Sequence, residues 1–172
     1  MTRALTIVTC IILTIIHSGY CQTSVEKKEP LSPKAISALI PKKIMNYSVK
    51  GDARSSRLSV GKLTYSLCQR DFTNREKHVQ ILLFDYNAAE IMYNQSIRKW
   101  NEMSGVENDT IFFQKTTRTG QSIFESYFSR NKHSQIVMGI NERFFLTVSG
   151  NKIDLEELRS MVRLIDFEKF PK

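Results

Sequence analysis

Proline is absent from residues 42–170, although the chain of 172 residues contains four prolines. Pro30, Pro33 and Pro41 precede this stretch, and Pro171 follows it. Proline removes a backbone donor and interrupts helices and strands. Its absence therefore predicts a single, uninterrupted hydrogen-bonded domain over residues 42–170, which is long enough to bury a core. Residues 22–41 are predicted to form a polar tether that includes a short helix.

Cysteine is equally scarce, because only Cys68 of the three cysteines lies in the body of the chain. Cys10 and Cys21 belong to the N-terminal segment. A domain with one cysteine cannot form an internal disulfide, so its stability has to come from packing. No histidine lies near Cys68 in the sequence, and we expect this residue to be a small buried hydrophobe rather than a nucleophile.

The sequence has few residues or motifs that could act as catalytic groups, metal ligands or cofactor sites. His17 lies in the N-terminal segment, and neither His78 nor His133 has a second ligand at metal spacing, so no metal site is predicted. The sequence also lacks a Gly-x-Ser-x-Gly elbow and a glycine-rich phosphate loop. We expect no cofactor. Asp85 follows an apolar run and could place a carboxylate of a catalytic pair at the sheet edge, although a turn or helix cap at Asp85 or Asn87 is the more frequent role and nothing in the sequence nominates a partner carboxylate.

The N-terminus has the pattern of an export signal. Arg3 precedes an apolar run over residues 4–16, and small and polar residues follow it. This predicts a cleavable signal peptide over residues 1–21, too short to span a bilayer. Cutting after Cys21 leaves no transmembrane span and a periplasmic or secreted protein. Two alternatives remain, namely a lipid anchor on Cys21 and a buried helix of the folded domain.

The remaining chain is basic. The whole sequence has a net charge of +8, and without Arg3 it keeps 24 basic against 17 acidic residues, or +7. In an exported protein this charge favours a partner protein, lipid headgroups or an anionic envelope component over nucleic acid. Nine basic residues form a predicted anion- or partner-binding surface, with an ordinary solvated surface as the alternative: Lys42, Lys43, Lys50, Arg54, Arg57, Lys62, Arg70, Arg75 and Lys77.

Apolar periodicity predicts the first half of the fold. Ser32 is expected to cap a short helix that begins at Pro33 and ends before Pro41. Two strands follow, over residues 63–68 and 79–84. The second is apolar on both faces and is therefore expected to lie centrally in a sheet. Residues 88–103 form an expected helix, because apolar side chains recur at three- and four-residue spacing.

The second half reads as a meander of four strands over residues 110–117, 122–130, 134–140 and 143–149, separated by turn residues. Gly150 and Asn151 are expected to end the last strand. Asp154 and Glu157 form a capping box for a closing helix with an apolar stripe. The predicted fold class is α+β, with a mostly antiparallel sheet, two main helices packed on it and a short N-terminal helix.

Three Asn-x-Ser/Thr triplets begin at Asn46, Asn94 and Asn108. In a eukaryotic secreted protein each would be a candidate glycan acceptor. Three triplets are a mild excess over chance, and in a bacterial protein they would carry no such meaning.

Four short motifs resemble a group of small exported bacterial proteins without assigned function. Residues 40–47 look like their Leu-Pro-x-x-Ile-x-Gly-Tyr opening, with Asn46 in place of the glycine. Residues 68–72 are similar to their small-x-Arg-x-aromatic strand, and residues 79–86 to their Val-x-Ile-x-x-x-Asp-Tyr strand. Residues 165–170 resemble the closing helix. The element order is also similar to the Mog1/PsbP type of sandwich. Both resemblances imply accessory or binding roles.

The sequence therefore favours a non-catalytic exported domain that binds a partner protein or an anionic envelope component. One alternative is a small exported hydrolase whose carboxylates include Asp85. Another is an inhibitor or immunity-type protein that acts on a neighbour-encoded toxin.

Overall fold

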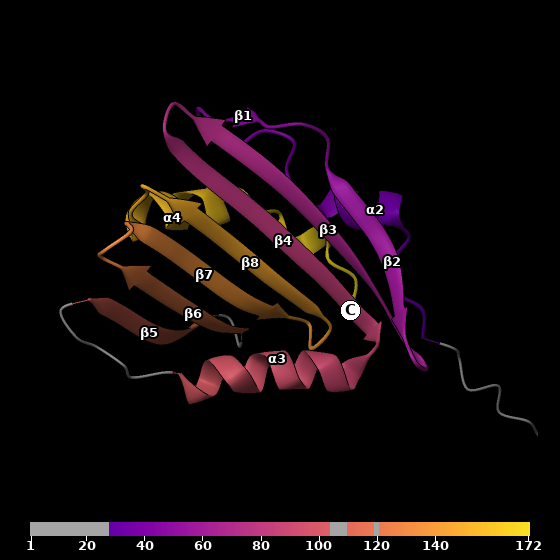
Figure 1. The fold of residues 1–172 in the computed structure, drawn as a ribbon. Coiled ribbons are helices and arrows are strands. Elements are labelled where there is room, and N and C mark those ends of the chain that lie inside the picture. Colours follow the sequence, from indigo (N-terminus) through magenta and orange to yellow (C-terminus); the bar gives the residue numbers. More distant parts are fainter. Residues whose placement is uncertain (1–27, 104–109, 119–120) are drawn as a thin grey trace, which may run out of the picture.

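Eight strands pair into one antiparallel sheet in the computed structural model, which describes residues 28–103, 110–118 and 121–172 (Figure 1). The predicted signal peptide, residues 1–21, lies outside the described residues. The elements follow one another along the chain as α2 (Pro33–Leu39), β1 (Ser48–Val49), β2 (Arg54–Val60), β3 (Leu63–Asn74), β4 (Lys77–Ala88), α3 (Glu90–Glu102), β5 (Ile111–Arg118), β6 (Gln121–Phe128), β7 (His133–Ile140), β8 (Phe144–Asn151), α4 (Leu155–Val162) and the 3-10 turn η1 (Phe167–Lys169).

The strand order across the sheet is β1-β3-β4-β8-β7-β6-β5, and β2 pairs with β3 beside β1. Every strand pairing is antiparallel. Hairpins join most neighbours, whereas α3 carries the chain from β4 to β5 at the far edge. The meander then returns until β8 pairs with β4. This confirms the α+β class with a mostly antiparallel sheet, and it confirms the central position of β4.

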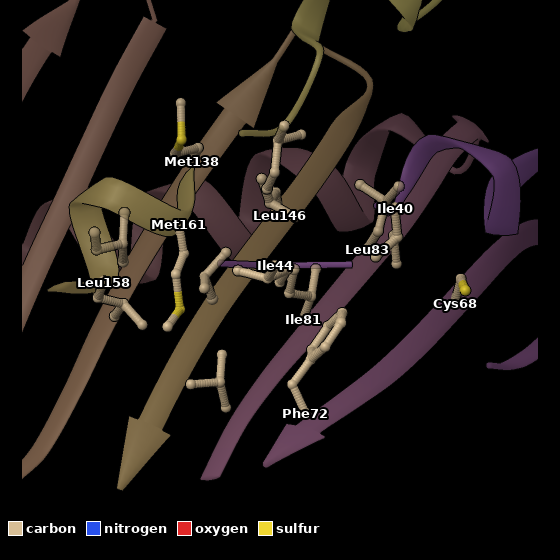
Figure 2. Packing of buried hydrophobic residues seen from close by; sticks show 14 of the residues in the cluster. Ile40, Ile44, Cys68, Phe72, Ile81, Leu83, Met138, Leu146, Leu158 and Met161 are labelled. Carbon is tan, nitrogen blue, oxygen red and sulfur yellow. The ribbon is translucent and has the colours of Figure 1, made fainter. Parts of the chain in front are cut away.

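Successive side chains of a strand point to opposite faces of the sheet, and helices cover both faces. Val79, Ile81 and Leu83 of β4 point to the face under α2 and α4, where the larger core lies (Figure 2). Phe84 and Tyr86 point to the other face and pack in a second cluster with Tyr93 of α3. In Figure 1, α2 and α4 lie behind the sheet and α3 crosses its other side.

The two main helices form where the apolar stripes predict them, but they begin differently. Asp154 caps α4 as expected, by accepting a hydrogen bond from the Glu157 backbone N–H at 2.8 Å, whereas the Glu157 side chain accepts from Tyr47 and Lys77. Helix α3 instead has Ala89 at its N-cap and no side-chain cap. The expectation that Asp85 or Asn87 would start α3 is wrong, because both precede its N-cap and belong to the end of β4.

The four predicted strands of the second half are confirmed as β5 to β8. At the β7–β8 turn, Asn141 and Glu142 both adopt positive φ angles of 52° and 51°, which suit a two-residue hairpin. β8 ends at Asn151, as expected, and it includes Gly150 and Asn151, two residues beyond the predicted strand over residues 143–149. β1 and β2 were not predicted.

Strand β3 extends beyond the predicted residues 63–68, to Asn74. Ser66 and Cys68 are fully buried, whereas Tyr65 is only half-buried. Ser66 tolerates burial because its hydroxyl donates to the Leu31 carbonyl at 2.5 Å. Cys68 is a buried free cysteine, as predicted, and burial raises the pKa of its thiol.

Part of the expected tether lies against the sheet. Ile36 of α2 is fully buried in the larger core. Arg70, on the strand beneath, donates to the carbonyls of Ile40 and Pro41, both at 2.8 Å. In the described part of the chain, no helix is both long enough and apolar enough to span a membrane.

Candidate functional site: the open polar face of the sheet

Helix α3 covers only one half of its sheet face, and the other half carries polar side chains open to solvent. They come from alternate positions of β3, β4, β7 and β8, which the strand register places side by side. A groove of about 1000 Å³ runs over these positions, and we call it the polar groove. Its polar lining comprises Lys50, Asp52, Arg54, Gln69, Asp71, Thr73, His78, Gln80, His133, Ser149 and Asn151.

Asp71 is the central carboxylate of the polar groove. Arg54 donates to it at 2.7 Å, Gln80 at 3.0 Å, and the Gln69 amide at 3.1 and 3.2 Å. Burial acts to raise the pKa of Asp71, but the hydrogen bonds from Gln80, Gln69 and Arg54, together with the charge of Arg54, outweigh it and hold the pKa below its usual value. Asp71 therefore stays ionised and fixes the orientation of three donor side chains.

His78 and His133 lie in one row across the groove. His78 of β4 and His133 of β7 both pair in register with Asn151 of β8. The Nδ1 atom of His133 lies 2.8 Å from the Asn151 side-chain oxygen, so this nitrogen carries the proton and donates. Two imidazoles far apart in the sequence thus share one sheet face with an amide between them.

The structure brings only two of the nine predicted basic residues to this groove, namely Lys50 and Arg54. Three others are engaged elsewhere. Arg57 donates to the Pro30 carbonyl at 2.6 Å, and Lys77 contacts Glu157 of α4 at 2.6 Å. Arg70 is buried, with 6% of its surface exposed.

The remaining four predicted basic residues are exposed but do not share one surface. Lys62 lies in the β2–β3 turn, and Arg75 lies in the β3–β4 turn at the opposite end of β3. Lys42 and Lys43 follow α2. The basic stretch of sequence is therefore spread over both faces and both ends of the sheet.

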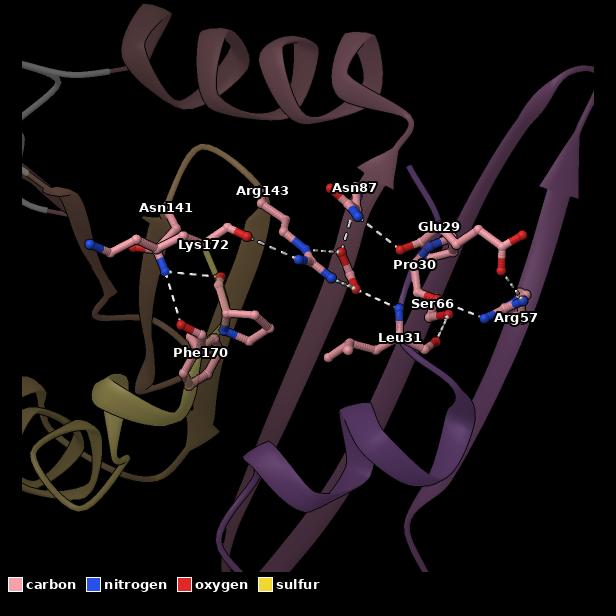
Figure 3. Close-up of polar contacts among 12 residues, drawn as sticks. Glu29, Pro30, Leu31, Arg57, Ser66, Asn87, Asn141, Arg143, Phe170 and Lys172 are labelled. Atoms are coloured by element: carbon pink, nitrogen blue, oxygen red, sulfur yellow. Dashed lines mark hydrogen bonds and ion pairs between the residues drawn. The ribbon is translucent and has the colours of Figure 1, made fainter. Parts of the chain in front are cut away.

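Asp85 is fully buried and its carboxylate is saturated by donors. Arg143 binds it through two parallel contacts of 2.8 Å, and the backbone N–H groups of Leu31 and Asn87 donate at 2.7 and 3.0 Å (Figure 3). Both oxygens accept charge-assisted bonds in a site without exposed surface. These contacts give Asp85 a structural role, because neither of its carboxylate oxygens is free to contact a substrate.

The contacts around Asp85 tie both described ends of the chain to the sheet. Asn87 donates to the Glu29 carbonyl at 2.8 Å, beside the Leu31 and Arg57 contacts. On the other side, Asn141 donates to the carbonyls of Phe170 and Pro171, at 3.2 and 3.1 Å (Figure 3). We call these contacts the Asp85 clamp.

Other predicted positions lie away from the polar groove. Asn46 is exposed before β1, and Asn94 is exposed on α3, whereas Asn108 lies outside the described residues. Among residues 28–103, 110–118 and 121–172, no group of three or more His, Cys, Asp and Glu side chains is placed to hold a metal ion. The groove offers amides, hydroxyls, imidazoles, two cationic groups and two carboxylates, a set suited to reversible binding of a polar ligand.

Gln69, Asp71, Gln80, Ser149 and Asn151 of the groove were not among the predicted site residues. A local signal for the first three was present in the sequence. Gln69 and Asp71 alternate with buried residues of β3, and Gln80 does the same between Val79 and Ile81. Polar residues at every second position of a strand indicate a solvent-facing side.

The low pKa of Asp71 makes a prediction for acid stability. A carboxyl whose pKa is lower in the folded than in the unfolded state stabilises the fold above the unfolded value, about 3.9. This stabilisation is lost as the pH falls through the lower, folded value. We expect the difference in free energy of unfolding between wild type and Asp71→Asn to be constant above about pH 5 and to shrink below about pH 4. Urea denaturation between pH 7 and pH 2 measures it, and a difference independent of pH would contradict this role.

No family model, no curated protein and no solved structure matches the chain. The resemblance to small exported bacterial proteins and to the Mog1/PsbP sandwich therefore stays a prediction.

Proposed function

We propose that this protein is an exported, non-catalytic binding protein that holds an anionic envelope polymer in the polar groove. The observation that carries the proposal is the gathering of Lys50, Arg54, two imidazoles and several amides on the half of a sheet face that α3 leaves uncovered. The groove crosses five neighbouring strands, which at strand spacing is about 19 Å. A groove of this length can hold a segment of an extended polymer.

The lining carries Lys50 and Arg54 against Asp52 and Asp71, so its formal charges balance, and the attraction for an anionic ligand comes from Lys50 and the neighbouring Lys152. Arg54 already forms an ion pair with Asp71, whereas Lys50 is exposed and makes no ion pair among the described residues. Lys152 follows Asn151 at the end of the groove and contacts exposed Glu76 at 2.7 Å. Surface pairs of this kind are weak, so a polyanion can compete for the lysine. The amides and hydroxyls of Gln69, Gln80 and Ser149 would bind the uncharged polar groups of the same polymer.

Export is part of the proposal and rests on the N-terminal sequence. Arg3, the apolar run over residues 4–16 and the polar residues after Cys21 are typical of a signal peptide. A periplasmic or secreted protein meets anionic polymers of the cell envelope, which gives the basic charge of the chain a partner.

Isothermal titration calorimetry with dextran sulfate and neutral dextran tests the binding. We expect dextran sulfate to bind at low salt and to bind more weakly at high salt, because exposed charges are screened. Lys50→Gln should weaken this binding about threefold to fivefold, the effect of one exposed charge.

Lys99→Gln is the matched control, since Lys99 is exposed on α3 away from the polar groove. The proposal is wrong if neutral dextran binds equally well, or if Lys99→Gln weakens binding as much as Lys50→Gln does. Failure of dextran sulfate to bind under low salt would also overturn it.

A further inference from the structure

We propose that a second groove, between helix α4 and the β5–β7 part of the sheet, binds a single-chain amphiphile with one anionic head group. The groove has a volume of about 670 Å³, which is within the usual range of ligand pockets. It lies on the sheet face opposite the polar groove. We call it the α4 groove.

One part of the α4 groove is apolar, and the rest is lined by polar and charged side chains. Ile123 of β6 and Met138 of β7 pair in register and form its floor. Val162 at the end of α4 and Phe167 of η1 form the opposite wall, and both are only partly buried. An apolar chain placed here would remove the exposed parts of Ile123, Val162 and Phe167 from water, which is favourable in proportion to the area buried.

An ion pair fixes one side of this apolar surface. Glu125 of β6 is buried, and Arg159 of α4 donates to both of its carboxylate oxygens, through Nε at 2.9 Å and through Nη2. Arg159 also contacts exposed Glu156. Because both oxygens of Glu125 are occupied, the groove offers no free carboxylate to a cationic ligand.

Arg163 supplies the charge that selects an anion. It lies four residues after Arg159, so the two side chains share one side of the helix end. Arg163 is exposed and makes no ion pair within the described part of the chain. The lining therefore holds two guanidinium groups, of which Arg159 is paired with carboxylates and Arg163 is the one available to an anion beside the apolar surface.

This arrangement distinguishes an amphiphile from other occupants. A second copy of this chain without its predicted signal peptide would bring another net charge of +7 toward Arg163, which opposes self-association. A carboxylate at the end of an alkyl chain matches both parts of the groove, because its head group meets Arg163 while its tail covers Ile123 and Val162.

Calorimetric titration with dodecanoate, dodecanol and dodecyltrimethylammonium, each below its micellar concentration, tests the proposal. We expect dodecanoate to bind most tightly and the cationic amphiphile most weakly. Arg163→Gln should weaken dodecanoate about tenfold, the effect of one charge-assisted hydrogen bond, and should leave dodecanol unchanged. Arg98→Gln on α3 is the matched control, because Arg98 is exposed on the opposite side of the sheet.

Val162→Phe should weaken dodecanoate and dodecanol alike, since the larger side chain fills the groove. A thermal melt of each variant shows that it is folded, and Thr116→Phe on β5 replaces Val162→Phe if the latter fails to fold. Equal affinity for dodecanoate and dodecanol, no binding of dodecanoate, or an equal loss in Arg98→Gln would each overturn the proposal.

Discussion

Asp85→Asn is expected to destabilise the protein by about 3–5 kcal/mol, because it leaves the largely buried guanidinium of Arg143 without its counter-charge. The side chain of Arg143 is only 11% exposed, so water cannot replace the lost carboxylate. The asparagine amide would also direct a donor at the guanidinium or at the backbone N–H of Leu31 or Asn87. Urea denaturation followed by circular dichroism measures the loss.

Two further variants separate the ion pair from a general effect of substitution. Asp52→Asn makes the same chemical change at an exposed position and should alter the free energy of unfolding by less than about 0.5 kcal/mol. Asp85→Leu combined with Arg143→Met should be less destabilising than the sum of the single changes, because no unpaired charge remains buried. A loss below about 1 kcal/mol in Asp85→Asn would contradict the clamp.

Gly150→Ala is expected to destabilise the protein by about 1–3 kcal/mol through overpacking. A Cβ atom at Gly150 would lie 2.3 Å from Cγ2 of Ile153 and 3.2 Å from the His78 carbonyl oxygen. Ile153 is buried in the larger core, so its branched side chain has little room to move. The expected destabilisation is steric. Because β8 pairs with both β4 and β7 at Gly150, the backbone has little freedom to move away from Ile153.

Ser149→Ala is the matched control for Gly150→Ala, because Ser149 is the preceding residue and faces the open polar groove. Its effect should stay within about 0.5 kcal/mol. Combining Gly150→Ala with Ile153→Ala should cost less than the two changes separately, since the second removes the clashing atom. Additive losses would show that Ile153 is not the cause.

Local periodicity predicted the elements whose side chains face a core. Leu158 and Met161 recur at helical spacing and are fully buried beneath α4, and the meander was marked by turn residues between apolar runs. Strand β2 was not predicted, because it is an edge strand with largely exposed side chains, among them Arg54 and Arg57. With little burial, an edge strand shows no alternation of apolar residues.

The polar groove could be predicted only in part. Alternation marks Gln69 and Asp71 as one polar side of β3, but the pairing of His78 with Asn151 joins residues far apart in the chain. Asp85 and Arg143 are likewise separated by 58 residues. Register between distant strands is set by the whole fold, and no local pattern in the sequence indicates which strands become neighbours.

The pairing of β4 with β8 also constrains the order in which the chain folds. Once β4 has been synthesised, one of its edges can pair with β3. The other edge of β4 has no partner strand until residues 144–151 have been synthesised. Contacts of such long sequence separation carry a large loop-closure entropy and slow folding. In the meantime β4 presents an open, apolar edge of the kind that aggregates.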